Sequence, residues 1–218
     1  MQYLRDRIKQ LLDRDSFKGK NKLFISSAGT SRRLALDTLL GDQDRIYSEV
    51  EPNPSFDQII KFGVTIKYCE DYHVIAIGGG SVIDFAKLVS LFHSMEPDAI
   101  KGGIRSLPQP LPTVYPITCI PTLFGSGAEQ TPYAVCYIDG QKFSVAASSM
   151  KPTEVVYIPE FATSIPPQIK LANIIDCFCQ AAESLTAQHS NGQSDNFAKD
   201  AIRLLLQSAD DYILGAGS

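Results

Sequence analysis

The chain has 218 residues, of which 44% are hydrophobic and 20% are charged, and its net charge is −4. These values are typical of a globular protein, and the length suits one large domain or one domain and part of a second. The 20 lysines and arginines form no basic stripe, which argues against nucleic acid as a partner. No apolar run approaches the roughly 20 residues of a membrane span, and the charged first residues lack a secretory signal. We therefore expect a cytoplasmic protein that does not enter a membrane.

Strand-like and helix-like segments alternate through the first two thirds of the chain. The predicted strands are residues 23–26, 46–50, 73–77, 115–120 and 155–158. The predicted helices are residues 3–12, residues 32–40, a helix that starts at residue 56 after a Pro-Asn-Pro-Ser turn, and residues 82–92. This alternation predicts a parallel sheet that is covered by helices on both faces.

A hairpin, a loop and a change of character complete the organisation. Asp139-Gly140 lies between residues 134–138 and 143–146 and predicts a β-hairpin, whereas the Pro- and Gly-rich residues 97–112 predict a surface loop. After Pro166-Pro167 we predict two helices, residues 171–187 and 195–206, with an exposed apolar face and no strand after them. The expected domains are therefore an α/β domain over residues 1–165 and the start of a helical domain over residues 166–218.

The five cysteines predict buried, reduced thiols, because their number is odd and most lie in apolar runs. Cys177 and Cys179 are two positions apart on a predicted helix and face different directions, so we interpret them as structural. The other three cysteines are Cys69, Cys119 and Cys136.

The most informative segment is a buried strand that runs through Gly78-Gly79-Gly80 directly into a helix. Glycines allow positive φ angles and let a ligand approach the backbone, and a helix start offers free N–H groups and a positive dipole end to a phosphate. Ser81 can cap the helix or donate to a phosphate oxygen. A simple turn needs only one glycine, so the three in a row predict phosphate binding. The G-x-G-x-x-G pattern is absent here and in the first βα turn, which argues against a standard Rossmann dehydrogenase.

Two further segments are weak signals when each is taken alone. Residues 121–131 follow a strand and are dense in small and hydroxyl side chains, as many loops are. Asp176 and Gln180 are four positions apart on a helix and present two oxygen donors on one face, which is also the pattern of an ordinary exposed polar pair.

Taken together and in order, these segments resemble the iron-containing (group III, metal-dependent) alcohol dehydrogenase family. Dehydroquinate synthases and glycerol-1-phosphate dehydrogenases share that architecture but match these strings less well. Within the family, residues 133–144 and 180–185 are most similar to the phosphonoacetaldehyde reductases. The matching positions are Pro52-Asn53-Pro54, Gly78-Gly79-Gly80-Ser81 with Asp84 and Lys87, residues 121–131, Lys142, Pro166-Pro167, and Asp176 with Glu183.

The resemblance implies a Rossmann-like parallel-sheet domain followed by the beginning of an all-helical domain, as in dehydroquinate synthase. It implies NAD or NADP as coenzyme and a divalent metal, iron or zinc, that polarises the substrate carbonyl. The glycine turn and Ser81 would hold the pyrophosphate. Ser27 stands where many relatives carry a ribose-binding acid, so a 2′-phosphate is permitted, with Arg32 or Arg33 as its partner. The other expected coenzyme residues are Asn53, Asp84, Thr122, Ser126 and Lys142.

The metal site departs from the family, which uses an aspartate and three histidines. Asp176 matches the aspartate, but Gln180 stands where the first histidine belongs, and an amide is a poorer ligand than imidazole. None of His73, His93 and His189 matches a ligand position, and the first two are expected to be structural. The loop is also changed, because residues 122–128 lack two of the usual hydroxyls.

These departures leave three functional hypotheses. The first is the NAD(P)H-dependent, metal-assisted reduction of a small aldehyde, such as phosphonoacetaldehyde to 2-hydroxyethylphosphonate, by a parent enzyme of which this chain is a C-terminally truncated piece. The second is a nucleotide-binding module or remnant without catalysis, and the third is a sugar-phosphate cyclase. We expect NAD(P)H binding but negligible turnover for the chain itself, and the resemblance leaves a homodimer open.

Overall fold

The computed structural model describes residues 2–66, 72–93, 95 and 114–215, and the chain forms two compact units. Unit 1 comprises Met1–Thr122 and Gly127–Ile158, and unit 2 comprises Leu123–Ser126 and Pro159–Ser218. The predicted boundary between residues 165 and 166 therefore falls inside unit 2. The predicted loop over residues 97–112 and Cys69 lie outside the described residues.

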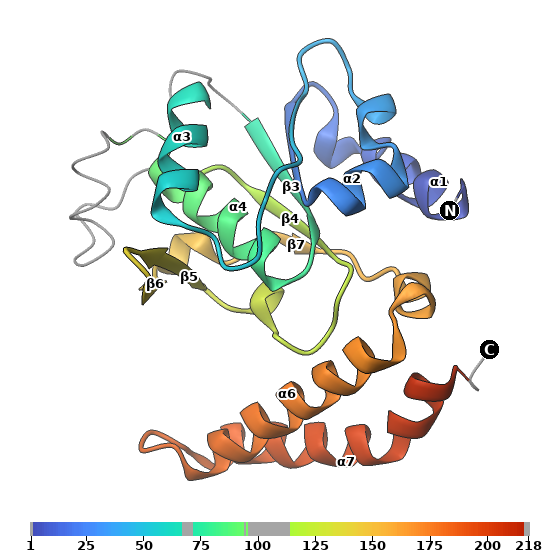
Figure 1. Ribbon diagram of the computed structural model, residues 1–218, viewed down its shortest axis with the longest axis vertical. Helices are drawn as coiled ribbons and strands as arrows, with labels where there is room; N and C mark the ends of the chain where they lie inside the picture. Colours follow the sequence, from blue (N-terminus) through green and yellow to red (C-terminus); the bar gives the residue numbers. More distant parts are fainter. Residues whose placement is uncertain (1, 67–71, 94, 96–113, 216–218) are drawn as a thin grey trace. The chain divides into compact units, whose positions relative to one another are not determined.

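Unit 1 is built on a five-stranded parallel sheet with the strand order β2-β1-β3-β4-β7 (Figure 1). The predicted parallel α/β fold is confirmed. The strands are β1 (Asn21–Ser26), β2 (Arg45–Tyr47), β3 (Tyr72–Gly78), β4 (Ile117–Pro121) and β7 (Glu154–Val155). The helices are α1 (Gln2–Leu12), α2 (Ala28–Leu34), α3 (Phe56–Ile66) and α4 (Gly80–Phe92), with shorter 3-10 turns between elements.

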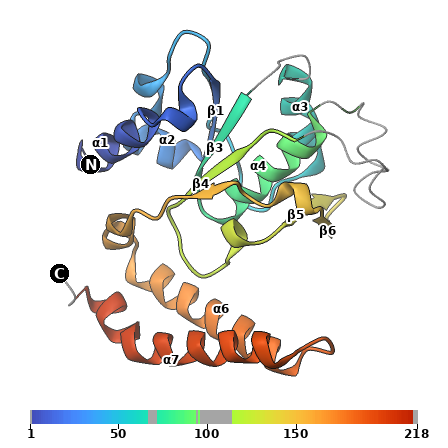
Figure 2. The same ribbon diagram turned by 180° about the vertical axis from the view of Figure 1, so that it is seen from behind.

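Alternate residues of a strand point to opposite sides of the sheet, and in β1, β3 and β4 the residues on both sides are buried. Helices α3 and α4 cover one face, as Figure 1 shows, and α1 and α2 lie against the other, as the reverse view in Figure 2 shows. The core on the α4 side includes Leu23, Ile25, Val74, Ala76, Ile117 and Cys119, and the core on the other side includes Phe24, Ile75, Ile77 and Ile120 with Leu4, Ile8 and Leu11 of α1.

The first βα connection differs from its prediction. Helix α2 begins at Ala28 instead of residue 32, because the Oγ of Ser27 accepts the Thr30 N–H at 3.3 Å and caps the helix. The helix ends at Leu34, its C-cap Ala35 has a left-handed φ of 48°, and a 3-10 turn follows over Leu36–Leu39. The prediction of one helix over residues 32–40 was therefore wrong, because residues 27–30, which we interpreted as a turn, form the N-cap and first turn of the helix.

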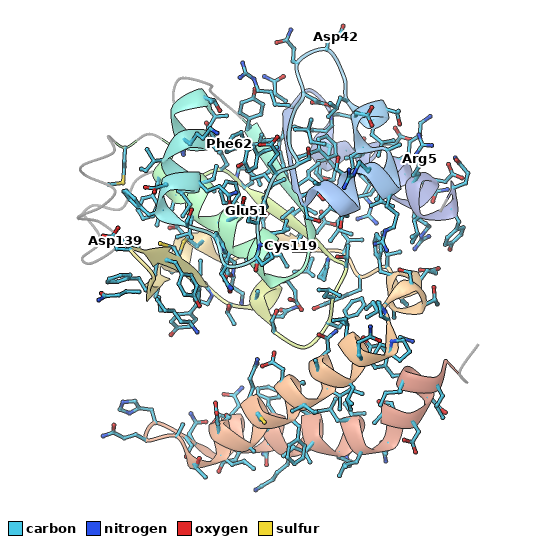
Figure 3. The ribbon with its side chains drawn as sticks, in the orientation of Figure 1. Arg5, Asp42, Glu51, Phe62, Cys119 and Asp139 are labelled. Atoms are coloured by element: carbon cyan, nitrogen blue, oxygen red, sulfur yellow. The ribbon has the colours of Figure 1, made fainter. Side chains whose placement is uncertain are left out.

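The predicted hairpin is confirmed and consists of β5 (Tyr133–Ile138) and β6 (Gln141–Ala146), paired antiparallel. Both tip residues have positive φ, 49° at Asp139 and 77° at Gly140, as a type I′ turn requires. Figure 3 labels Asp139 at this tip. The Tyr137 N–H donates to the Pro54 carbonyl at 2.9 Å and ties the hairpin to the turn before α3.

Unit 2 consists of a 3-10 turn (Pro159–Ser164) and two long helices, α6 (Pro167–Thr186) and α7 (Gly192–Leu214), that pack along each other. The side chain of Asn191 accepts the N–H groups of Gln193 and Ser194 and starts α7 with a capping box. The predicted exposed apolar face is present. Its large side chains are Ile169, Leu171, Ile175, Phe178, Phe197, Leu204, Leu206 and Leu214.

The cysteines differ in exposure. Cys119, which Figure 3 labels, and Cys136 are buried as predicted, and burial raises the pKa of the two thiols to about 12 and about 11. Cys177 is half-buried and Cys179 is exposed, so the prediction of a buried thiol was wrong for Cys179. Among the described residues, no helix is both long and apolar enough to cross a membrane.

Candidate nucleotide-binding site

The carboxyl ends of β1 and β3 form the point at which the sheet changes direction. From β1 the chain continues to β2 on one side, and the next strand, β3, pairs with β1 on the other side. In open α/β sheets, ligands bind in the crevice that such a reversal creates at the carboxyl ends of the strands. The two ends are held together, since the buried hydroxyl of Ser26 donates to the Ile77 carbonyl at 2.8 Å.

The predicted glycine turn lies at this edge. Gly78 ends β3, Gly79 is the N-cap and α4 begins at Gly80. The hydrogen-bond ladder of the helix starts with Val82 and Ile83, whose N–H groups donate to the Gly79 carbonyl at 3.0 and 3.2 Å. The N–H groups of the residues before that ladder, positions 80 and 81, are those that a helix start offers to an anion.

Close packing, and not an unusual backbone angle, explains the glycine at position 78. None of the three glycines of the turn has a positive φ, so the expected left-handed backbone is not used here. A Cβ on Gly78 would lie 2.5 Å from Cγ2 and 2.6 Å from Cβ of Val82, which is closer than carbon atoms can approach. The glycine therefore lets α4 start directly against the end of β3.

Asn53 and Ser81 meet beside the turn. The N–H of Asn53 donates to the Oγ of Ser81 at 3.1 Å, and Asn53 has a left-handed φ of 58°. Because Gly79 is the N-cap of α4, Ser81 does not cap the helix, and its predicted role in phosphate binding stays a prediction. The Ser81 hydroxyl accepts from Asn53 and keeps its own hydrogen for an acceptor.

Thr122 joins this group from the next strand. It is buried, and its N–H donates to the Gly78 carbonyl at 3.0 Å. The structure thus brings together six of the nine predicted coenzyme positions, Asn53, the three glycines of the turn, Ser81 and Thr122, from three separate stretches of sequence. Lys142 is exposed on β6, and Ser126 is exposed in unit 2. For these two residues a coenzyme role stays a prediction.

Asp84 has a partner within the protein. Its Oδ2 accepts the Val135 N–H of β5 at 3.1 Å. Burial raises the pKa of this carboxyl to about 6, although the Val135 N–H and the charges of Lys87 and Lys142 lower it. Its predicted contact with the coenzyme stays a prediction.

Lys87, one turn further along α4, is fully buried. It donates to three backbone carbonyls. Burial lowers the pKa of its ammonium group, and the negative charge of Asp84 raises it by a smaller amount. Sequence reasoning quoted Lys87 as part of a motif and missed this role. The sequence did contain a signal for this role, because Lys87 is a charged residue flanked by apolar residues in the predicted helix.

Ser27 directly follows β1, the strand that pairs with β3, at the same edge of the sheet as the glycine turn. Its hydroxyl is engaged locally, since it accepts from the Thr30 N–H and donates to the Thr30 hydroxyl at 3.1 Å. The end of β1 therefore presents a neutral side chain where an acid would repel a 2′-phosphate. Arg32 follows on α2 and is exposed.

The predicted metal pair is present in unit 2 but is incomplete. The Nε2 of Gln180 donates to the Oδ2 of Asp176 at 3.0 Å, and both side chains are exposed on α6. The amide thus turns its N–H₂ group, and not its oxygen, to the carboxylate. Within residues 2–66, 72–93, 95 and 114–215, no three His, Cys, Asp or Glu side chains lie together as metal ligands would. One carboxylate and one amide do not fit a catalytic metal.

The histidines of unit 1 are structural, as predicted. The Nε2 of His73 lies 2.8 Å from the Thr118 hydroxyl, and its ring packs on Phe17. Burial, with a smaller effect of Lys20, lowers the pKa of His73 to about 4. His93 stacks on Tyr115.

Unit 2 also shows why one loop glycine is required. Gly125 has a φ of 132°, and a Cβ there would lie 2.8 Å from the Asn173 carbonyl oxygen of α6. The segment Leu123–Ser126 therefore lies directly on the helix backbone, and only a glycine permits this approach.

The fold and the edge of the sheet define an open parallel α/β protein with a candidate nucleotide-binding site. The sequence model of the family described as iron-containing alcohol dehydrogenase matches residues 5–159, which is well over half of the chain. The protein belongs to this family.

Individual relatives agree with this assignment. Aldehyde-alcohol dehydrogenase 2 of Entamoeba histolytica is 30% identical over 174 residues, which cover 75% of this chain and 20% of that protein. The iron-containing alcohol dehydrogenase of Thermotoga maritima has a TM-score of 0.78 at 25% identity and matches 97% of this chain and 59% of its own.

The same fold occurs in sulfoacetaldehyde reductase from Bifidobacterium kashiwanohense, solved in complex with NAD+. Its TM-score is 0.80 at 22% identity, and the match covers 96% of this chain and 57% of that one. The chain therefore spans less than two thirds of the length of each of these three proteins.

Proposed function

We propose that the protein binds NAD or NADP through unit 1 and serves the reduction of a small aldehyde to an alcohol as part of an iron-type alcohol dehydrogenase. The observation that carries the proposal is the start of α4 at the reversal point of the sheet, with Asn53, Ser81 and Thr122 gathered around Gly78. This arrangement offers backbone and hydroxyl donors at the place where open α/β sheets bind nucleotides. Family membership supports the oxidoreductase class.

The residues of unit 1 would bind and orient the coenzyme. The N–H groups of Gly80 and Ser81 and the Ser81 hydroxyl would donate to the pyrophosphate, and Asn53 and Thr122 would line the cleft beside it. We propose that Lys142 and Ser126 contact parts of the coenzyme other than the pyrophosphate. When bound, the reduced nicotinamide supplies a hydride to the carbonyl carbon while a proton reaches the oxygen.

Two finer assignments follow from particular residues. The neutral Ser27 and the neighbouring Arg32 permit the 2′-phosphate of NADP, so we propose that both coenzymes bind. The similarity of residues 133–144 and 180–185 to phosphonoacetaldehyde reductases suggests phosphonoacetaldehyde as the substrate, with 2-hydroxyethylphosphonate as the product.

The incomplete metal pair favours a second candidate for the chain itself, nucleotide binding without turnover. Asp176 is a single carboxylate with an amide as its neighbour, and a lone carboxylate holds a divalent ion weakly. We therefore derive no catalytic step through a metal from these residues.

Titration of the purified chain with NADH and NADPH, followed by coenzyme fluorescence, tests the proposal. We expect saturable binding of both coenzymes and negligible aldehyde reduction. Ser81→Ala should weaken binding about tenfold, as expected for a lost hydrogen bond to a charged group, whereas Ser190→Ala, at an exposed position of unit 2, should not. Absence of binding at millimolar coenzyme would overturn the proposal, and robust reduction by the chain would overturn the second candidate.

A further inference from the structure

Lys87 is a charged side chain with no exposure to solvent, on a helix whose other inward positions are mostly apolar. Its ammonium group donates to the carbonyls of Ala128, Thr131 and Tyr133 at 2.5, 2.7 and 2.8 Å. An ammonium group has three N–H donors, so these bonds use all of them. A buried charge is tolerated when it is bonded in this way. Lys87 therefore has no donor left for a ligand, and any role in binding must act through these carbonyls.

The three carbonyls lie at one end of the loop that begins at Thr122. At its other end, the Thr122 N–H donates to the Gly78 carbonyl at 3.0 Å. One end of the loop is thus bonded to the glycine turn, and the other end is bonded to α4 about two helical turns after the turn. Both attachments are made to the same strand–helix unit.

Asp84 adds a matching contact with the same stretch of chain. It lies three positions before Lys87, so the two side chains are neighbours on one face of α4. Asp84 accepts the N–H of Val135 at 3.1 Å, while Lys87 donates to the carbonyls just before it. The helix therefore binds residues 128–135 through donors and acceptors at once, which sets the position of that stretch along the helix.

We infer that Lys87 is a positioning residue for the coenzyme: through the carbonyls of Ala128, Thr131 and Tyr133 it holds residues 127–133 of unit 1 on α4, the helix that starts at the glycine turn to which Thr122 is bonded. The inference rests on the proposed function, because it assigns Lys87 to the same site. A loop that carries coenzyme contacts must hold them to a fraction of an ångström, and a shift of one ångström is sufficient for large losses of binding or rate.

Lys87→Met tests this role, because it keeps the apolar stem and removes the three donors. Ser90→Ala is the matched control: Ser90 is also buried on α4 and donates to a carbonyl, that of Tyr115 at 2.9 Å, which lies outside the loop. Both variants would be compared with the unaltered chain by circular dichroism, by NADH and NADPH titration, and by hydrogen–deuterium exchange of peptides over residues 122–135.

We expect Lys87→Met to weaken coenzyme binding by about tenfold or more and to speed exchange in residues 122–135, while residues 21–26 of β1 stay protected. Ser90→Ala should keep the coenzyme affinity even where its melting temperature falls. Equal affinity and equal loop exchange in the two folded variants would overturn the inference. Affinity losses that merely follow the fall in melting temperature in both variants would also overturn it, since they would show a general structural role.

Two further outcomes stay informative. If Lys87→Met does not fold, Lys87→Arg keeps the charge but presents its donors in a planar fork. Lys87→Arg should then show faster exchange in residues 122–135 and weaker coenzyme binding than the unaltered chain. Faster exchange in these residues with unchanged coenzyme affinity would contradict the inference. If the unaltered chain binds no coenzyme, the proposed function fails, and the exchange data alone decide whether Lys87 holds the loop.

Discussion

The two units of this protein differ in how far their large apolar side chains are covered. In unit 1 both faces of the sheet are covered, and buried polar groups such as Ser26, Lys87 and Ser90 have partners. In unit 2, the two helices expose large apolar side chains, and Asp176 has an amide as its neighbour. The described residues thus contain one candidate binding edge whose parts lie together and one incomplete set of metal ligands.

This difference follows from what each kind of site requires. A phosphate site can be built from backbone N–H groups at one strand–turn–helix junction, so a short stretch of sequence supplies most of it. A metal site needs three or four side chains converging on one point, usually from several elements. The nucleotide half of such a protein can therefore be complete while the metal half is not, and three changes test this contrast.

The largest effect is expected at the binding edge of unit 1. Gly78→Ala would place a Cβ 2.5 to 2.9 Å from three atoms of the Val82 side chain, so the start of α4 must move away from β3. We expect coenzyme affinity to fall about a hundredfold and the free energy of unfolding to fall by about 3 kcal/mol.

The double variant Gly78→Ala with Val82→Ala provides the control for this change. It removes two of the three close atoms and should recover part of the stability and affinity. Coenzyme titration and chemical denaturation measure both effects, and a single variant that binds as well as the unaltered chain would show that the close packing is not needed.

A second change tests whether the interior of unit 1 keeps His73 neutral. Burial lowers the pKa of His73 to about 4 from its usual 6.5, so the folded chain resists a proton that the unfolded chain accepts. The stability contributed by neutral His73 is full above pH 6.5 and is lost as the pH falls towards 4. A shift of this size corresponds to about 3 kcal/mol.

Asp84 has the opposite effect on the pH dependence of stability. Burial raises the pKa of its carboxyl to about 6, so its contribution to stability rises as the pH falls. The effect of His73 must therefore be measured as a difference. The stability advantage of the unaltered chain over His73→Leu should shrink between pH 7 and pH 4, as followed by urea denaturation. His189→Leu, at an exposed position, should show no such trend, and a constant advantage at position 73 would show that the interior does not keep His73 neutral.

The smallest effect is expected from completing part of the metal pair in unit 2. Gln180→His places an imidazole one turn from Asp176 and should tighten Zn²⁺ binding about tenfold, measured by competition with a chromophoric chelator. Gln168→His is the matched control, since it adds an exposed histidine to α6 without an acid one turn away. Equal affinities in the two variants would show that Asp176 does not act as a ligand.

Much of this arrangement could be predicted from the sequence because its signals are local. The strands β1, β3 and β4, the Asp139-Gly140 turn and the two helices after Pro166 each depend on neighbouring residues and appear close to where they were expected. The strands β2 (Arg45–Tyr47) and β7 (Glu154–Val155) are shorter than the predicted residues 46–50 and 155–158. The start of α2 was misplaced for a local reason as well, because Ser27 was assigned to a turn when it is a cap. The family resemblance supplied the site residues, which patterns alone left ambiguous.

The sequence by itself determined the parallel sheet, the glycine junction and the shortage of metal ligands, since each depends on residue type and short spacing. Only the tertiary structure decided that Asn53 donates to Ser81, that Gly78 is required by Val82, and that Lys87 serves three carbonyls more than 40 residues away. The contacts of Asn53 and Lys87 join segments that lie far apart along the chain, while the approach of Gly78 to Val82 is local but depends on the path of the backbone from β3 into α4. The two long-range contacts form because the sheet order brings the segments that follow β2 and β4 to the start and middle of α4, and that order is a property of the whole fold.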